Sequence, residues 1–190
     1  MTQSLEFETA VARMRDQQRA AEQREAHYHQ ARVLLLISHF TTAKKGVAGL
    51  TKLAKLDFLL RYPAMLERLL PSGVKSWPEG TAPTASERLA VESRMTRYKY
   101  GPWDQRYYSV LGSLAARGLI TYSDNARSEF LVTPEGAAAS TALAATPEWS
   151  IVADRIKVLK RHFNKSGSVL TNLIYDGLPD AVDRSRRTEN

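Results

Sequence analysis

The sequence predicts a mostly α-helical protein with one small β-hairpin, and residues 97–136 give the main grounds for that fold class. Pro102 suits the first residue of a helix, and Gly118 suits the left-handed position that ends one. Between them lies an apolar stripe at helical spacing, formed by Trp103, Tyr107, Val110, Leu111 and Leu114. This stretch therefore predicts an amphipathic helix over 102–117.

Two β-prone runs, 119–122 and 130–132, follow that helix, and the residues at 123–125 are typical of a turn. Thr133 and Pro134 then supply a cap and a first-turn proline for an alanine-rich helix. Helix, hairpin and helix in this order are typical of the second half of a winged-helix domain. We expect the stretch 94–100 to be a further strand that pairs with the hairpin.

The chain before this unit predicts several helices. Residues 4–30 have a short apolar edge and are then polar, which favours either a solvated helix or an arm that docks on a partner. Residues 31–42 are apolar on more than one face and predict a central, buried helix. A third helix over 50–62 buries leucines and places Lys52, Lys55 and Asp57 away from its stripe. Pro63 ends or restarts it, and a short helix continues to residue 70.

These elements predict the following organisation. An N-terminal helical arm spans 1–30, and a winged-helix domain spans 31–145. That domain contains a Pro- and Gly-rich flap at 71–84, and a capping box at Thr84–Glu87 opens a short helix after it. A C-terminal helical hairpin spans 146–176. Its first helix carries a stripe of Trp149, Val152, Ile156, Leu159 and Phe163, and its other face carries Arg155, Lys157, Lys160 and Arg161. Residues 177–190 are polar and predict a disordered tail.

Composition narrows the classes of protein. The 190 residues are 43% hydrophobic and include no cysteine, which excludes a disulfide framework and any thiolate metal site. No apolar run is long enough for a membrane span and the N-terminus lacks a signal core, so we expect a soluble, cytoplasmic protein.

The net charge of +7 is unevenly distributed, because residues 31–70 hold seven basic and only two acidic side chains. This clustering favours a polyanionic partner, although a basic solvated surface without a role is the alternative.

No catalytic motif accompanies this fold. There is no phosphate-binding glycine loop, no nucleophile elbow and no carboxylate cluster, so we expect neither an enzyme nor a cofactor. His27, His29 and His39 lack a fourth ligand at a suitable spacing, and we expect no metal site.

Binding is the remaining class of function. The polar face of the 102–117 helix offers few side chains that could contact base edges. Contacts to the backbone of double-stranded DNA are therefore favoured over sequence recognition. The candidates for phosphate contact are Lys44, Lys45, Lys52, Lys55, Arg94, Arg97, Lys99 and Arg106. The candidates for docking a protein partner are Trp103, Tyr107, Tyr108, Trp149 and Phe163, with core packing as the alternative for both tyrosines.

Two motifs are more specific than the composition of the chain explains. They are LTKLAKLDFLLRYP at 50–63, and RYKYGPWDQRYYSVLGSLAARGLI at 97–120 followed by FLVTPEG at 130–136. Together they resemble the middle component of ABC-type three-component systems, the small subunit of Lamassu-like anti-phage defence. The resemblance covers residues 27–145. It implies a non-catalytic winged-helix accessory subunit that assembles with an SMC/Rad50-like ATPase and an effector nuclease.

Under this resemblance, the subunit bridges the ATPase and adds a basic surface for DNA sensing, with no membrane and no small-molecule substrate involved. Two alternatives remain open. One is a free-standing winged-helix transcription regulator, and the other is a scaffold that does not contact DNA.

Overall fold

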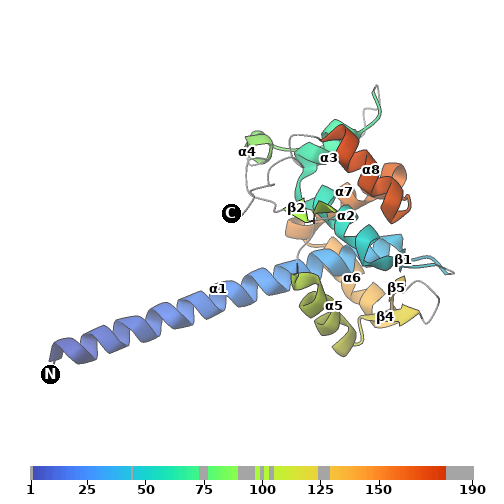
Figure 1. Cartoon of the computed structure of the whole chain (residues 1–190). Coiled ribbons are helices and arrows are strands. Elements are labelled where there is room, and N and C mark those ends of the chain that lie inside the picture. The colour runs from blue at the N-terminus through green and yellow to red at the C-terminus, as the bar shows by residue number, and fades with distance from the viewer. Residues whose placement is uncertain are drawn as a thin grey trace, which may run out of the picture.

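The computed structural model describes residues 2–43, 45–72, 77–89, 97–98, 101–102, 105–123 and 129–178. The described part is mostly helical with a small antiparallel sheet (Figure 1). The helices are α1 (Thr2–Phe40), α2 (Gly49–Arg61), α3 (Pro63–Leu69), α4 (Ala85–Leu89), α5 (Arg106–Ala116), α6 (Pro134–Ala144), α7 (Pro147–Phe163) and α8 (Gly167–Gly177). The strands are β1 (Val47–Ala48), β2 (Arg97–Tyr98), β3 (Gly101–Pro102), β4 (Ile120–Ser123) and β5 (Glu129–Val132).

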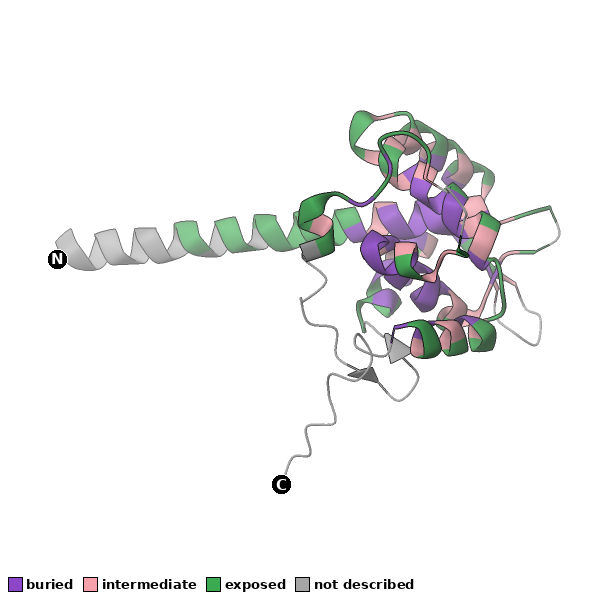
Figure 2. Ribbon diagram, turned by 90° about the horizontal axis from the view of Figure 1, so that it is seen from above, coloured by how far each residue is buried: buried purple, intermediate pink, exposed green. Residues whose placement is uncertain are grey.

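Helix α1 is one unbroken helix of 39 residues, so the predicted arm and the predicted central helix are the same element. Its N-terminal part projects from the body, as both ribbon views show (Figures 1 and 2). All side chains from Ala20 to Tyr28 are exposed, whereas Val33, Leu35 and Ile37 are fully buried. The sequence changes from polar to apolar at the point where the helix enters the body, and that change decides which part is buried.

The buried half of α1 is the centre of the core. Helices α2, α5, α6 and α7 all pack against it, and α8 packs on α2. The stripe predicted for the 102–117 helix is confirmed where it is described, since Tyr107, Val110, Leu111 and Leu114 are buried in α5. The two helices predicted over 146–176 are α7 and α8, but their main contacts are with the body and not with each other: α7 packs on α1, α2 and α6, and α8 packs on α2 and α3.

The three-stranded sheet has the order β1-β5-β4, with Val47 opposite Phe130 and Ile120 opposite Val132. The hairpin of β4 and β5 confirms the two predicted β-prone runs. The third strand was predicted wrongly: the partner of the hairpin is β1, while β2 pairs with β3 in a separate two-stranded sheet. Pro102 lies in that small sheet, and helix α5 begins only at Arg106.

Several local signals were predicted correctly. Gly118 has a φ of 68°, the left-handed value that suits glycine after a helix. The hydroxyl of Thr133 accepts a hydrogen bond from the backbone N–H of Gly136 at 3.0 Å and caps α6. Thr84 and Glu87 form the reciprocal capping box at the start of α4, with donor–acceptor distances of 2.8 and 3.2 Å.

Candidate functional site

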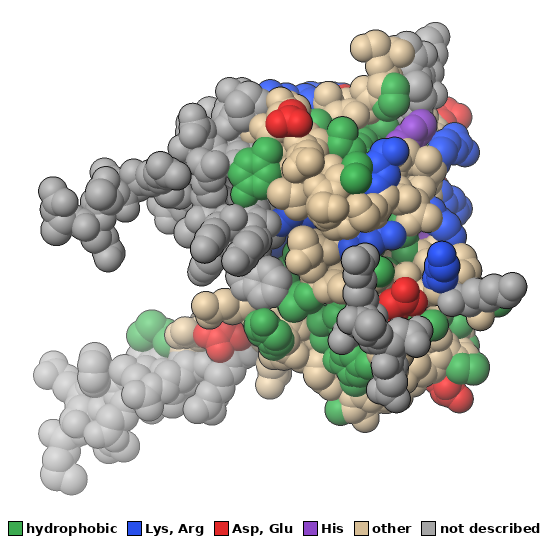
Figure 3. Space-filling model, turned by 45° about the vertical axis from the view of Figure 1, so that its right-hand side comes forward, with side chains coloured by type: hydrophobic (Ala, Val, Ile, Leu, Met, Phe, Trp, Pro, Cys, Tyr) green, Lys and Arg blue, Asp and Glu red, His purple; other side chains and the backbone are tan. Residues whose placement is uncertain are grey.

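Basic side chains gather on one face of the body, at the right of the view in Figure 3. We define the basic face as Lys52, Lys157, Lys160, Arg161 and Lys165. Contacts join its elements: the Lys52 ammonium donates to Asn164 Oδ1 at 2.9 Å, and the Lys160 ammonium donates to the carbonyl oxygen of His39 at 2.5 Å. The face therefore combines the start of α2, the last turns of α7 and the turn that follows it.

Two properties of this face favour an anionic partner. Lys157, Arg161 and Lys165 are exposed, so their charges are accessible to an anion, and the negative end of the α7 dipole stabilises the basic side chains of its last turn in their charged form. Burial lowers the pKa of His39, and the neighbouring charges of Lys157 and Lys160 lower it further. Lys157 also forms an ion pair with Asp154 at 2.7 Å, and both partners are solvent-accessible.

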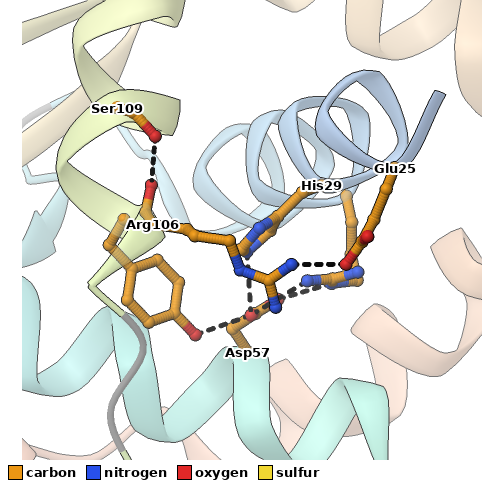
Figure 4. Close-up of polar contacts among 7 residues, drawn as sticks. Glu25, His29, Asp57, Arg106 and Ser109 are labelled. Atoms are coloured by element: carbon orange, nitrogen blue, oxygen red, sulfur yellow. Dashed lines mark hydrogen bonds and ion pairs between the residues drawn. The ribbon is translucent and has the colours of Figure 1, made fainter. Parts of the chain in front are cut away.

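A second polar feature lies inside the body, where three helices meet at Asp57 (Figure 4). The Asp57 side chain is fully buried. The guanidinium of Arg32 donates to both carboxylate oxygens, from Nε at 2.7 Å and from Nη2 at 3.2 Å. The hydroxyl of Tyr107 donates to Oδ2 at 2.6 Å, and His29 Nε2 lies 3.7 Å from the same oxygen. We call these four residues the Asp57 cluster.

The electrostatics of the Asp57 cluster keep the carboxylate ionised. Burial by itself raises the pKa of Asp57, but the charge of Arg32 and the surrounding hydrogen-bond donors outweigh it and hold that pKa well below the ordinary value. Burial also raises the pKa of Tyr107 well above its usual range, and the Asp57 charge acts in the same direction. The cluster is therefore a buried ion pair with a neutral tyrosine that locks α1, α2 and α5 together.

A pocket of about 310 Å³ opens beside this cluster. Its wall includes Arg32 and His29 of the cluster, and also Arg61, Arg106 and Arg155 from three other helices. Arg106 forms an exposed ion pair with Glu25 of α1 across the mouth. Four arginines and one histidine thus surround a single cavity, whose wall also includes the carboxylates of Glu25 and Glu87.

Arg155 holds one wall of this pocket in place. Its guanidinium binds both carboxylate oxygens of Glu87, at 2.7 and 2.9 Å, and donates from Nε to the carbonyl oxygen of Thr81 at 2.8 Å. These hydrogen bonds lower the pKa of Glu87 to about 2. Arg155 is only 8% exposed, so the prediction that it lies on the outer face of its helix is wrong. It anchors α4 and the preceding loop to α7.

The structure separates the eight candidates for phosphate contact. Lys45 and Arg106 are exposed, and Lys52 belongs to the basic face. Lys55 is 2% exposed, and burial lowers its pKa to about 8, so it does not lie on the surface where the sequence placed it. The remaining four, whose side chains lie outside the described part of the chain, are Lys44, Arg94, Arg97 and Lys99.

The candidates for docking a protein partner also differ in how far they are buried. Tyr107 and Phe163 are buried at 2% and 3% exposure and belong to the core. Trp149 is half-buried and packs on Tyr28 of α1, with ring centroids 4.8 Å apart. Tyr108 is 66% exposed and lines a shallow apolar hollow of about 550 Å³ between α2, α5 and the hairpin. Trp103 lies outside the described residues.

Sequence reasoning missed two groups. The Asp57 cluster was missed because periodicity assigns a charged residue in an amphipathic helix to the solvent side. The basic members of α7 were noted as the outer face of a helix but not as binding candidates. The signal was present in the repeated basic positions 157, 160, 161 and 165.

Comparisons with known proteins add no likeness to this geometry. No family model matches the chain, and no curated protein or solved structure matches it either. Within the described residues, no helix is long and apolar enough to cross a membrane, and no group of His, Asp or Glu side chains is arranged to hold a metal ion.

Proposed function

We propose that this chain is a non-catalytic accessory subunit of a complex between an SMC/Rad50-like ATPase and a nuclease in anti-phage defence. In this role it binds the ATPase and contributes a basic surface to the DNA path. Three features of the molecule support the proposal: the order of its elements, the basic face and the projecting arm of α1.

The order of elements supports a winged-helix assignment. The end of α1 is followed by β1, α2, α5, β4 and β5, and the sheet order β1-β5-β4 places the first strand beside the last. In a winged helix the hairpin strands follow the recognition helix in the same way. The stretch between α2 and α5, residues 62–105, is then an insertion into that fold.

The distribution of charge supports backbone contact with DNA rather than base readout. The basic face lies on α2, α7 and the turn after α7, and α5 contributes nothing to it. The exposed positions of α5 include Tyr108, Ser109 and Gly112, and Arg106 is paired with Glu25. Lysine and arginine contacts to phosphate supply affinity without sequence preference.

The main support for the accessory role is the projecting N-terminal arm of α1. Residues 2–28 form about 40 Å of continuous helix. From Ala20 to Tyr28 every side chain of this arm is exposed. A helix that leaves its own domain, with a short apolar edge followed by a polar stretch, is typical of a segment that bridges to another protein.

Co-purification with an SMC-like ATPase encoded beside this gene tests the proposal. The full chain should form a stoichiometric complex, and removal of residues 2–24 should abolish it. That deletion keeps Glu25 and Tyr28, whose partners lie on the body, so the unfolding midpoint of the body should change little. A full chain that stays monomeric in the presence of the neighbouring ATPase would refute the accessory role.

The DNA contact has its own test. Reversing two charges in Lys157→Glu/Arg161→Glu should weaken duplex binding for any sequence and reduce the slope of affinity against salt by about two. Arg117→Glu, an exposed reversal at the end of α5, serves as the matched control. Equal loss of affinity in both variants would contradict backbone binding through the basic face, and salt-insensitive complexes would favour a scaffold.

A free-standing transcription regulator is the second candidate, and the exposed α5 next to a hairpin is the observation that favours it. This role requires sequence-dependent binding by a dimer to a palindromic operator. A footprint on the protein's own promoter, lost in Arg117→Glu but kept in Lys157→Glu/Arg161→Glu, would decide for it.

A further inference from the structure

The pocket beside the Asp57 cluster has more hydrogen-bond donors than the cluster itself uses. An arginine side chain presents five N–H donors, and Asp57 accepts from two of those of Arg32. His29 is 4% exposed and lines the pocket; its Nε2 lies 3.7 Å from Asp57 Oδ2 and makes no hydrogen bond. A contact of this length is longer than a hydrogen bond, so a ligand that comes closer would satisfy this buried nitrogen better than Asp57 does.

We propose that this pocket binds a phosphoryl group, and that the Glu25 carboxylate occupies the position of this anion beside Arg106 until the ligand displaces it. The site would use Arg106 and Arg61 at the mouth and His29 with Arg32 at the back. This inference does not depend on the ATPase partner proposed above, so the two proposals can fail separately.

The arrangement of donors favours a phosphoryl group over a flat carboxylate. The arginines that the site would use come from three different helices, α1, α2 and α5, whereas Arg155 of α7 already donates from all three nitrogens to Thr81, Ala82 and Glu87. Guanidinium groups that approach from several directions suit a tetrahedral anion, which offers acceptor oxygens on all sides. The volume of about 310 Å³ exceeds that of a single phosphate ion and leaves room for an attached group.

The two glutamates of the wall behave differently. Glu87 is held by Arg155 through two hydrogen bonds and stays with it. Glu25 lies on the exposed side of the pocket, with a side chain that is 65% exposed, and its partner Arg106 is 49% exposed. An exposed ion pair contributes little to stability, so exchanging one anion for another on Arg106 costs little. Glu25 is therefore the group that a ligand can replace.

Calorimetric titration of the full chain in low-salt buffer tests the site with pyrophosphate, AMP and adenosine as probes. Pyrophosphate and AMP should bind with one-to-one stoichiometry, and adenosine should not bind. Arg106→Gln should weaken binding about tenfold, since a charge-assisted contact is lost. Glu25→Gln should tighten binding, because the competing carboxylate is gone.

Two substitutions outside the pocket provide matched controls. Arg117→Gln changes an exposed arginine at the other end of α5, and Glu22→Gln changes an exposed glutamate one turn before Glu25. Both should keep the wild-type affinity. Binding of adenosine as tightly as AMP, equal weakening in Arg106→Gln and Arg117→Gln, or no saturable binding of either phosphate probe would each overturn the proposal.

The source of the phosphoryl group is decided by a second pair of probes. A short DNA duplex with 5′-phosphate ends is compared with the same duplex carrying 5′-hydroxyl ends, so that contacts to the basic face cancel. A preference for the phosphorylated duplex that Arg106→Gln removes identifies a nucleic-acid end as the source. Equal affinity for both duplexes, together with binding of AMP, identifies a free nucleotide.

Discussion

Replacing Asp57 by alanine should be among the most damaging single changes in this protein. The substitution leaves the Arg32 guanidinium, which is 6% exposed, without the carboxylate that accepts two of its hydrogen bonds. Removing one partner of a buried ion pair costs about 3–5 kcal/mol of folding free energy, because the other charge stays buried and uncompensated. The Tyr107 hydroxyl loses its acceptor in the same step.

Urea unfolding measured by tryptophan fluorescence and by circular dichroism checks this magnitude. Tyr107→Phe is the matched control, because it removes one hydrogen bond to the carboxylate and leaves the ion pair intact; it should cost about 1.5–3 kcal/mol. The double change Arg32→Met/Asp57→Leu removes both charges and should recover most of the stability lost in Asp57→Ala.

The pH dependence supplies an independent check. The folded pKa of Asp57 lies below its unfolded value, so its contribution to stability is present above that unfolded value and is lost as pH falls toward the folded one. The stability difference between wild type and Asp57→Ala should therefore narrow below about pH 4, by up to about 1.4 kcal/mol per pH unit. A cost below about 1 kcal/mol at pH 7, or a difference that does not depend on pH, would refute the buried ion pair as a stabilising lock.

Three further substitutions test other parts of the fold. Gly136→Ala should cost at least about 2 kcal/mol in the same unfolding assay. The reason is steric, since the added Cβ would lie 1.8 Å from the carbonyl oxygen of Leu119. Gly112→Ala meets nothing within 4 Å and should instead stabilise α5 by about 0.5–1 kcal/mol; the opposite order would contradict the packing described. In Glu87→Gln, the free energy of unfolding should fall less between about pH 4.5 and pH 2 than it does in the wild type, because the low pKa of Glu87 depends on Arg155. An unchanged pH profile would show that this ion pair contributes nothing.

The sequence predicted those parts of the fold that are specified locally. Thr133 before a proline, the Thr84–Glu87 capping box and Gly118 after an apolar stripe each act within a few residues, and each adopts the predicted conformation. Helix α7 was predicted for the same reason, since its apolar stripe repeats over many turns.

The features that were predicted wrongly depend instead on contacts between residues distant in the chain. Strand β1 has two residues, and it is a strand because β5 lies beside it, which no local pattern reveals. Asp57 and Arg155 have charges that periodicity assigns to solvent, but each is buried with partners distant in the chain. Such positions are decided by tertiary pairing, which explains why the pocket and the Asp57 cluster could not be predicted from the sequence.

Helix α1 has a mechanical consequence. It joins a projecting helical segment of about 40 Å to the centre of the core without a break, and the Asp57 cluster lies where that segment enters the body. Because the helix is continuous, a partner that tilts its far end would exert force on the contacts of Arg32 and His29 with Asp57. The pocket lined by those side chains lies beside those contacts, so a partner that holds the arm in one direction would also act on the wall of the pocket.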